Sequence, residues 1–184
     1  MSDKASQPDL CDHRQDATDV FDVRKFTAIF DVDEDRLRLD TVDHHSRTEV
    51  IYFTKRLLDR LIPVLAENLE KTDTSTMVQQ FEQDRVRINR EQMPPDTPDV
   101  TFRDAPTWLC KAVRVSPCEN GLVLSFLENK VPVTQMRLTW TDIRSFLDIL
   151  LLAYRRGYWA TAVFPDWIRL RSQTLPHAQT HRMQ

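Results

Sequence analysis

The stretch VIYFTKRLLDRLIPVLAENL, residues 50–69, contains a complete transition from strand to helix. Val50–Phe53 is a short apolar run, which predicts a buried strand. Thr54 can cap the following helix by accepting a hydrogen bond from an amide of its first turn. The residues after it place an apolar stripe on one face of that helix. The stripe consists of Leu57, Leu58, Leu61, Ile62, Leu65 and Leu69. Pro63 interrupts it, and we expect a kink there because the stripe continues beyond it.

Two further strands are predicted before this stretch. FTAIFDV (Phe26–Val32) and RLRLDT (Arg36–Thr41) alternate apolar with small or polar residues, the period of a half-buried strand. Three acidic residues separate them, and such a polar segment favours a turn. Together with Val50–Phe53 they predict an antiparallel meander that leads into a helix.

The second half of the chain repeats this order. Strands are predicted at Trp108–Val115, Leu122–Leu127 and Val131–Trp140. Asn120-Gly121 favours the turn before the second of them, because both residues tolerate positive φ. A helix should follow the third strand, as in the first half.

The predicted boundaries of this last helix come from its flanking residues. Thr141 is the expected N-cap, and the helix is expected from about Asp142 to Arg156. Gly157 should adopt the left-handed conformation that commonly ends a helix. Arg155 and Arg156 then lie near the negative end of the helix dipole.

These elements predict an α+β fold of two antiparallel three-stranded meanders, each followed by a helix and packed as one pseudo-symmetric domain. The pattern suits an internal pseudo-repeat, and it equally suits a common way of covering a sheet. The domain is expected at 25–168, with halves 25–71 and 107–168 and a mixed, Pro-rich connector at 72–106. An acidic flexible leader is expected at 1–24 and a basic C-terminal tail at 169–184. Whether residues 84–90 form helix or strand stays undecided.

Composition argues against several classes of function. The chain has 184 residues, a net charge of −3 and only two glycines. Phosphate-binding loops need clustered glycine, so nucleotide-binding motifs are absent. Three cysteines are too few for a disulfide scaffold, and no signal peptide or membrane-spanning run is present in the sequence. We therefore expect a soluble, cytoplasmic protein.

Candidate catalytic and metal-binding residues are few. Asp43-His44-His45 is the string most like a metal site, but neighbouring strand residues point in opposite directions and no second ligand motif accompanies it. Cys110 is expected to be a small core residue, because free cysteine is readily buried. Neither Cys110 nor Cys118 has a histidine positioned nearby in sequence to act as a base. The sequence thus predicts no catalytic residue, no metal and no cofactor.

Arg85, Arg87 and Arg90 form a small basic stretch. Arginines on one face of a strand could contact phosphates. With the C-terminal arginines they support an alternative role, a nucleic-acid-associated module.

The segment LLAYRRGYWATAVFPDWIRLRS, residues 151–172, carries the candidate interaction residues. The helix before it is apolar on nearly every side, so it must be covered all round. The segment could fold back over this helix, or it could await a partner, because aromatic residues and arginine concentrate in interface cores. The candidates are Arg155, Arg156, Tyr158, Trp159, Phe164, Trp167 and Ile168.

The sequence therefore favours a non-enzymatic protein-interaction protein, such as an assembly factor, a small accessory subunit or a regulator. Its expected partner is another protein or a second copy of itself, with no membrane and no small-molecule substrate. The alternatives are the nucleic-acid-associated module and an enzyme whose site consists of dispersed residues.

Overall fold

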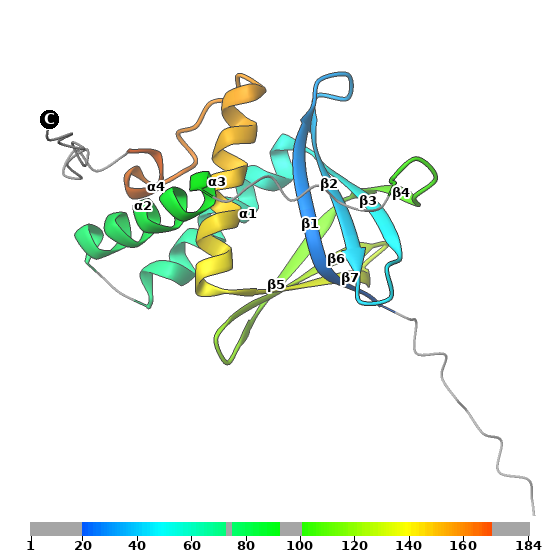
Figure 1. The fold of residues 1–184 in the computed structure, drawn as a ribbon, viewed down its shortest axis with the longest axis horizontal. Helices are drawn as coiled ribbons and strands as arrows, with labels where there is room; N and C mark the ends of the chain where they lie inside the picture. Colours follow the sequence, from blue (N-terminus) through cyan, green and yellow to red (C-terminus); the bar gives the residue numbers. More distant parts are fainter. Residues whose placement is uncertain (1–19, 73–74, 93–100, 171–184) are drawn as a thin grey trace, which may run out of the picture.

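A computed structural model describes residues 20–72, 75–92 and 101–170. Residues 1–19 of the expected leader, residues 171–184 of the expected tail and most prolines of the connector lie outside these ranges. The strands are β1 (Phe21–Asp31), β2 (Arg36–Asp43), β3 (Thr48–Phe53), β4 (Thr107–Cys110), β5 (Ala112–Cys118), β6 (Gly121–Glu128) and β7 (Val131–Thr139). The helices are α1 (Lys55–Glu70), α2 (Thr76–Gln92), α3 (Trp140–Arg156) and α4 (Asp166–Arg169), and they gather on one side of the strands (Figure 1).

The strands form one seven-stranded mixed sheet in the order β4-β3-β2-β1-β7-β6-β5. The expectation of two separate three-stranded meanders in a pseudo-symmetric domain is therefore wrong. Two parallel pairings overturn it: β1 pairs with β7, and β3 pairs with β4. Both join segments that are distant in sequence, and the alternation within a strand carries no information about such partners.

The sheet curls until its two edges meet. Its edge strands β4 and β5 are separated in sequence only by Lys111, so the chain passes directly from one edge to the other. The rings of Phe53 on β3 and Phe126 on β6 have centroids 5.3 Å apart. Strands in those positions of a flat sheet would lie about 19 Å apart. The enclosed face of the curled sheet therefore holds part of the hydrophobic core.

Helix α1 begins as the sequence predicts. The side chain of Thr54 accepts a hydrogen bond from the backbone N–H of Leu57, and the helix runs without a break through Pro63. Its buried residues reproduce most of the predicted stripe: Leu58, Leu61, Ile62, Leu65 and Leu69. In the described parts of the chain, no helix has the length and apolar character needed to cross a membrane.

Helix α3 begins at Trp140 and not at Asp142. Its N-cap is Thr139, which accepts from the N–H of Asp142 while the Asp142 carboxylate accepts from the backbone N–H of Thr139. The prediction that Thr141 caps the helix is thus wrong. The reciprocal pairing with an acid at the third helical position selects Thr139, because it satisfies two donors at once.

The undecided segment 84–90 is helical and belongs to α2. Its inward face is polar: Gln79, Gln83, Asp84 and Arg87 are buried. This face packs against α3, which also contacts β1, β6 and β7. Helix α3 is therefore covered by the sheet on one side and by the other helices on the other, as its apolar sequence requires.

Candidate functional site

Helix α3 ends in a turn that exposes an aromatic ring. The N–H of Tyr158 donates to the carbonyl of Arg155, and the N–H of Trp159 donates to the carbonyl of Tyr154. These two bonds define a Schellman motif, in which the residue after the C-cap is left-handed. That residue is Tyr158, with φ of 53°. Gly157 is the C-cap itself, with φ of −80°, so the prediction that it is left-handed is wrong.

Tyr158 combines an unfavourable backbone conformation with almost complete exposure. Its side chain is 96% exposed. A left-handed conformation costs an L-residue with a bulky side chain about 1–2 kcal/mol. Within the described residues no hydrogen bond or ring contact of its side chain offsets this cost. Packing inside the molecule therefore does not explain the choice of tyrosine.

The ring next to it, Trp159, is held by its neighbours. It makes edge-to-face contacts with Phe30 and Tyr154, at centroid distances of 5.2 and 5.0 Å. Its indole N–H donates to Oδ1 of Asp35 at 3.1 Å, in the turn between β1 and β2. The left-handed turn is thus anchored to the tip of the β1–β2 hairpin.

The structure divides the candidate interaction residues into two groups. Phe164, Trp167 and Ile168 are buried in the core. The indole N–H of Trp167 donates to Oε1 of Glu70 at 2.9 Å, which fastens α4 to the end of α1. The segment after α3 therefore folds back over the helices through these three residues. Trp159 is half-buried, while Arg155, Arg156 and Tyr158 are exposed.

A second exposed apolar residue lies at the same end of the molecule. Val32, in the β1–β2 turn, is 79% exposed. The hydrogen bond between Trp159 and Asp35 brings this turn beside the end of α3. We call this surface the Tyr158 end; its exposed members are Val32, Arg155, Arg156 and Tyr158.

The first turns of α1 also lie at the Tyr158 end. The hydroxyl of Tyr154 donates to Oδ1 of Asp59 at 2.9 Å, and Nζ of Lys55 lies 5.6 Å from the Tyr154 ring centroid. Beside them is a hollow of about 240 Å³. It is lined by Thr54, Arg56, Leu57, Arg60, Leu109, Cys110 and Lys111, and we call it the basic hollow. None of the described residues that line it is acidic.

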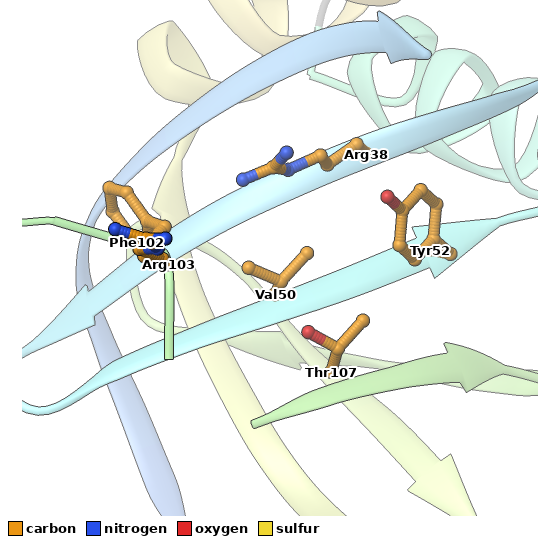
Figure 2. A pocket seen from close by; sticks show the side chains of 6 residues that line it. All are labelled: Arg38, Val50, Tyr52, Phe102, Arg103 and Thr107. Carbon is orange, nitrogen blue, oxygen red and sulfur yellow. The ribbon is translucent and has the colours of Figure 1, made fainter. Parts of the chain in front are cut away.

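A larger cleft of about 490 Å³ lies on the outer face of β2, β3 and β4 (Figure 2). Figure 2 shows the Arg38 guanidinium pointing along the cleft toward Phe102 and Arg103, away from Tyr52. The strand positions of the cleft, Arg38, Val50, Tyr52 and Thr107, alternate with core-facing residues and so face outward. The lining residues are Arg38, Val50, Tyr52, Phe102, Arg103 and Thr107.

Two polar side chains of the outer cleft, Arg38 and Tyr52, are already engaged with carboxylates. Nε of Arg38 donates to Oδ1 of Asp40 at 2.6 Å, and this bond raises the pKa of Arg38. The Tyr52 hydroxyl donates to Oδ2 of Asp31 at 2.8 Å, which lowers the pKa of Asp31. Desolvation, together with the Asp31 carboxylate, raises the pKa of Tyr52. Such a phenol stays protonated at neutral pH, so the cleft offers hydrogen bonds and no ready base.

Cys110 is buried, as the sequence predicts. Desolvation raises the pKa of its thiol to about 11. A thiol with that pKa is protonated at neutral pH, and the thiolate is the nucleophilic form. Cys118 is exposed at the end of β5. Cys110 is therefore not an activated nucleophile in this structure.

Asp43 organises a turn in the structure. Its Oδ1 accepts from the backbone N–H groups of His45 and Arg47, and its Oδ2 accepts from Nε of Arg47 at 2.5 Å. The side chains of His44 and His45 are exposed. Across the described residues, no cluster of three or more His, Cys, Asp or Glu could hold a metal ion.

The carboxylate of Glu49 is buried on the inner face of the sheet. Oε1 of Glu49 accepts from the indole N–H of Trp108, and Oε2 accepts from the hydroxyl of Thr134 at 2.8 Å. Desolvation raises the pKa of Glu49. Both oxygens have a partner, so the group ties β3 to β4 and β7.

The basic stretch of α2 is engaged within the molecule. Arg87 donates through Nε to Oδ1 of Asp148 at 2.8 Å and through Nη2 to the carbonyl of Ile168 at 2.7 Å. Arg90 donates to Oδ2 of the same aspartate at 2.6 Å, and Arg85 pairs with Glu82. These contacts give the three arginines a role in joining α2 to α3 and α4 and in stabilising α2.

Sequence reasoning missed the basic hollow and the outer cleft. A signal for the hollow existed: two cations, Lys55 and Arg56, follow the N-cap Thr54, where acids are usual. Comparison with protein-family models, curated proteins and solved structures finds no match for this chain. The geometry alone must therefore support any functional conclusion.

Proposed function

We propose that this chain is a non-enzymatic protein-interaction protein, such as an assembly factor, accessory subunit or regulator, and that it contacts its partner through the Tyr158 end. One observation carries the proposal: a tyrosine with φ of 53° has its side chain 96% exposed. Residues in sparsely populated backbone conformations cluster at functional positions, so this exposed outlier supports a functional role.

The chemistry of the surrounding surface supports this role. Tyrosine and arginine are enriched among the residues that contribute most to protein interfaces. Tyr158 presents the ring, Arg156 presents a cation, and Val32 adds an apolar contact. Arg155 adds a second cation, although its Nη2 donates to the carbonyl of Arg169 at 3.3 Å. Trp159, held by Asp35 and Phe30, anchors the turn that carries the exposed ring.

The variant Tyr158→Gly separates folding from binding. Glycine adopts the left-handed conformation freely, so the free energy of unfolding should rise by about 1 kcal/mol. Loss of the ring should weaken association at least ~10-fold. Affinity capture from the native host with quantitative mass spectrometry measures partner binding, and sedimentation velocity measures self-association.

Val131→Ser is the matched control. Val131 is exposed and begins β7, three residues before Thr134, which pairs with Phe21 at the opposite end of β1 from Val32. This substitution should leave both partner binding and self-association unchanged. The proposal is wrong if Tyr158→Gly retains the partners and the self-association of the natural chain, or if Val131→Ser loses them equally.

A further inference from the structure

The basic hollow gathers three cations from two parts of the chain. Arg56 and Arg60 lie one turn apart on α1, and Lys111 connects β4 to β5. In the described residues none of the three has an ion pair or a side-chain hydrogen bond. Leu57, Leu109 and the buried Cys110 line the same hollow.

This arrangement works against the stability of the free protein. Like charges at i and i+4 on a helix repel each other. Cations near the first turn also face the positive end of the helix dipole. Helix α1 has no acidic residue in its first turn, whereas α3 places Asp142 there. The charge of Lys55 is balanced by Asp59, whose Oδ2 lies 2.7 Å from Nζ of Lys55. The charges of Arg56 and Arg60 have no such balancing partner among the described residues.

We propose that the basic hollow binds acidic side chains, carboxylate or phosphate, of a partner polypeptide. An anion placed between Arg56, Arg60 and Lys111 would remove their mutual repulsion and complement the helix dipole. This inference rests on the proposed function, for which it names the chemistry of the partner. The contact through Tyr154 puts the hollow and Tyr158 at one end, so a single partner can reach both.

The surroundings favour a polypeptide over other anions. At about 240 Å³ the hollow is smaller than the sites that enclose small-molecule ligands. A nucleic-acid backbone needs an extended basic track. Asp33, Glu34 and Asp35 lie at the same end and would repel such a backbone, while one acidic side chain avoids them.

Three labelled synthetic peptides of equal length test the proposal with the full chain. One is rich in Asp and Glu, one carries phosphoserine in place of those acids, and one carries Asn and Gln. Fluorescence anisotropy should show binding of an acidic peptide that weakens with added salt, and no binding of the neutral peptide. The first two peptides distinguish carboxylate from phosphate as the preferred group.

The double variant Arg56→Gln/Arg60→Gln should weaken binding of the preferred peptide at least ~10-fold without lowering the midpoint of thermal unfolding. Arg114→Gln, which neutralises an exposed arginine on β5, is the control and should leave binding unchanged. The inference is overturned if Arg114→Gln weakens peptide binding as much as the double variant does. It is also overturned if the neutral peptide binds as tightly as the acidic peptides. Tighter binding of a single-stranded RNA oligonucleotide than of either acidic peptide overturns it as well.

Failure of the inference and failure of the proposed function are distinguishable. If Tyr158→Gly loses the native partner while Arg56→Gln/Arg60→Gln binds the peptides normally, the inference alone fails. If the double variant loses the peptides while Tyr158→Gly keeps every partner, the proposed role of Tyr158 alone fails.

Discussion

The ring of Phe30 occupies the space in which a β-carbon of residue 157 would stand. An ideal Cβ built on Gly157 would lie 2.5 Å from Cε2 and 2.7 Å from Cζ of Phe30. Glycine is therefore required here by a close approach and not by a positive φ. The same ring supports Trp159, so the hairpin formed by β1 and β2 and the end of α3 meet at this contact.

Gly157→Ala should lower the free energy of unfolding by about 1–3 kcal/mol, because the added methyl group forces the Phe30 ring to move. Urea denaturation measures the change. Ala162→Ser, at an exposed position after the turn, should have almost no effect. An unchanged midpoint for Gly157→Ala would show that the ring has room to shift.

Replacing either N-cap threonine should destabilise the protein. Thr54→Ala and Thr139→Ala should each cost about 1 kcal/mol, because each removes the acceptor for a first-turn amide. Thr141→Ala is the control and should stay within about 0.5 kcal/mol of the natural chain, since Thr141 is exposed inside the first turn. A larger loss at Thr141 than at Thr139 would contradict the observed helix start.

Asp148 holds the buried ionic contacts between α2 and α3. Asp148→Ala should cost about 3–5 kcal/mol, because it removes the buried carboxylate that both Arg87 and Arg90 contact. Arg87 keeps its second buried pair, with Asp84 at 3.0 Å. Glu82→Gln breaks the more exposed pair with Arg85 and should cost less than about 1 kcal/mol. Chemical denaturation of the two variants compares them directly. Similar losses would mean that Arg87 finds other partners after the substitution.

Asp43 should make stability depend on pH under acidic conditions. Burial alone would raise its pKa, but hydrogen bonds from the Arg47 side chain and from two backbone N–H groups outweigh this and lower the pKa below 3.8. The folded carboxylate thus binds its proton less readily than the unfolded one. Its contribution to stability is complete well above 3.8 and is lost as pH falls through the folded pKa.

Asp43→Asn should therefore be less stable than the natural chain at neutral pH, and the difference should shrink as the solution is acidified toward pH 3 or so. Urea denaturation across this range measures it. A difference that stays constant, or that grows on acidification, would exclude this role for Asp43.

Local features of the fold could be predicted from sequence, and pairings between distant segments could not. Thr54 caps α1 because cap and partner are three residues apart. The parallel pairing of β1 with β7 leaves no local trace in either strand. Helix α2 lacked an apolar stripe because its inward face uses Gln83 and Arg87 for hydrogen bonds to α3.

In the candidate site, too, local features could be predicted and contacts between distant segments could not. Tyr158 could be singled out from its neighbours in sequence. The close approach of Phe30 to residue 157 could not, because it joins two segments that are far apart in the chain. In the basic hollow, Lys111 lies beside Arg56 and Arg60 because β3 pairs with β4. The spacing of residues along the sequence does not indicate that these three cations are close together.

Closure of the sheet has a consequence for how the protein is made. Phe21 pairs with Thr134, so more than half of the chain lies between the two strands that join the halves of the sheet. During synthesis β1, β2 and β3 leave the ribosome long before β7. Until β7 emerges, the edge of β1 that pairs with it has no partner strand. Contacts of such high sequence separation form slowly, which exposes the nascent chain to mispairing. The interval before β7 emerges is thus the time when a chaperone would be of most use to this chain.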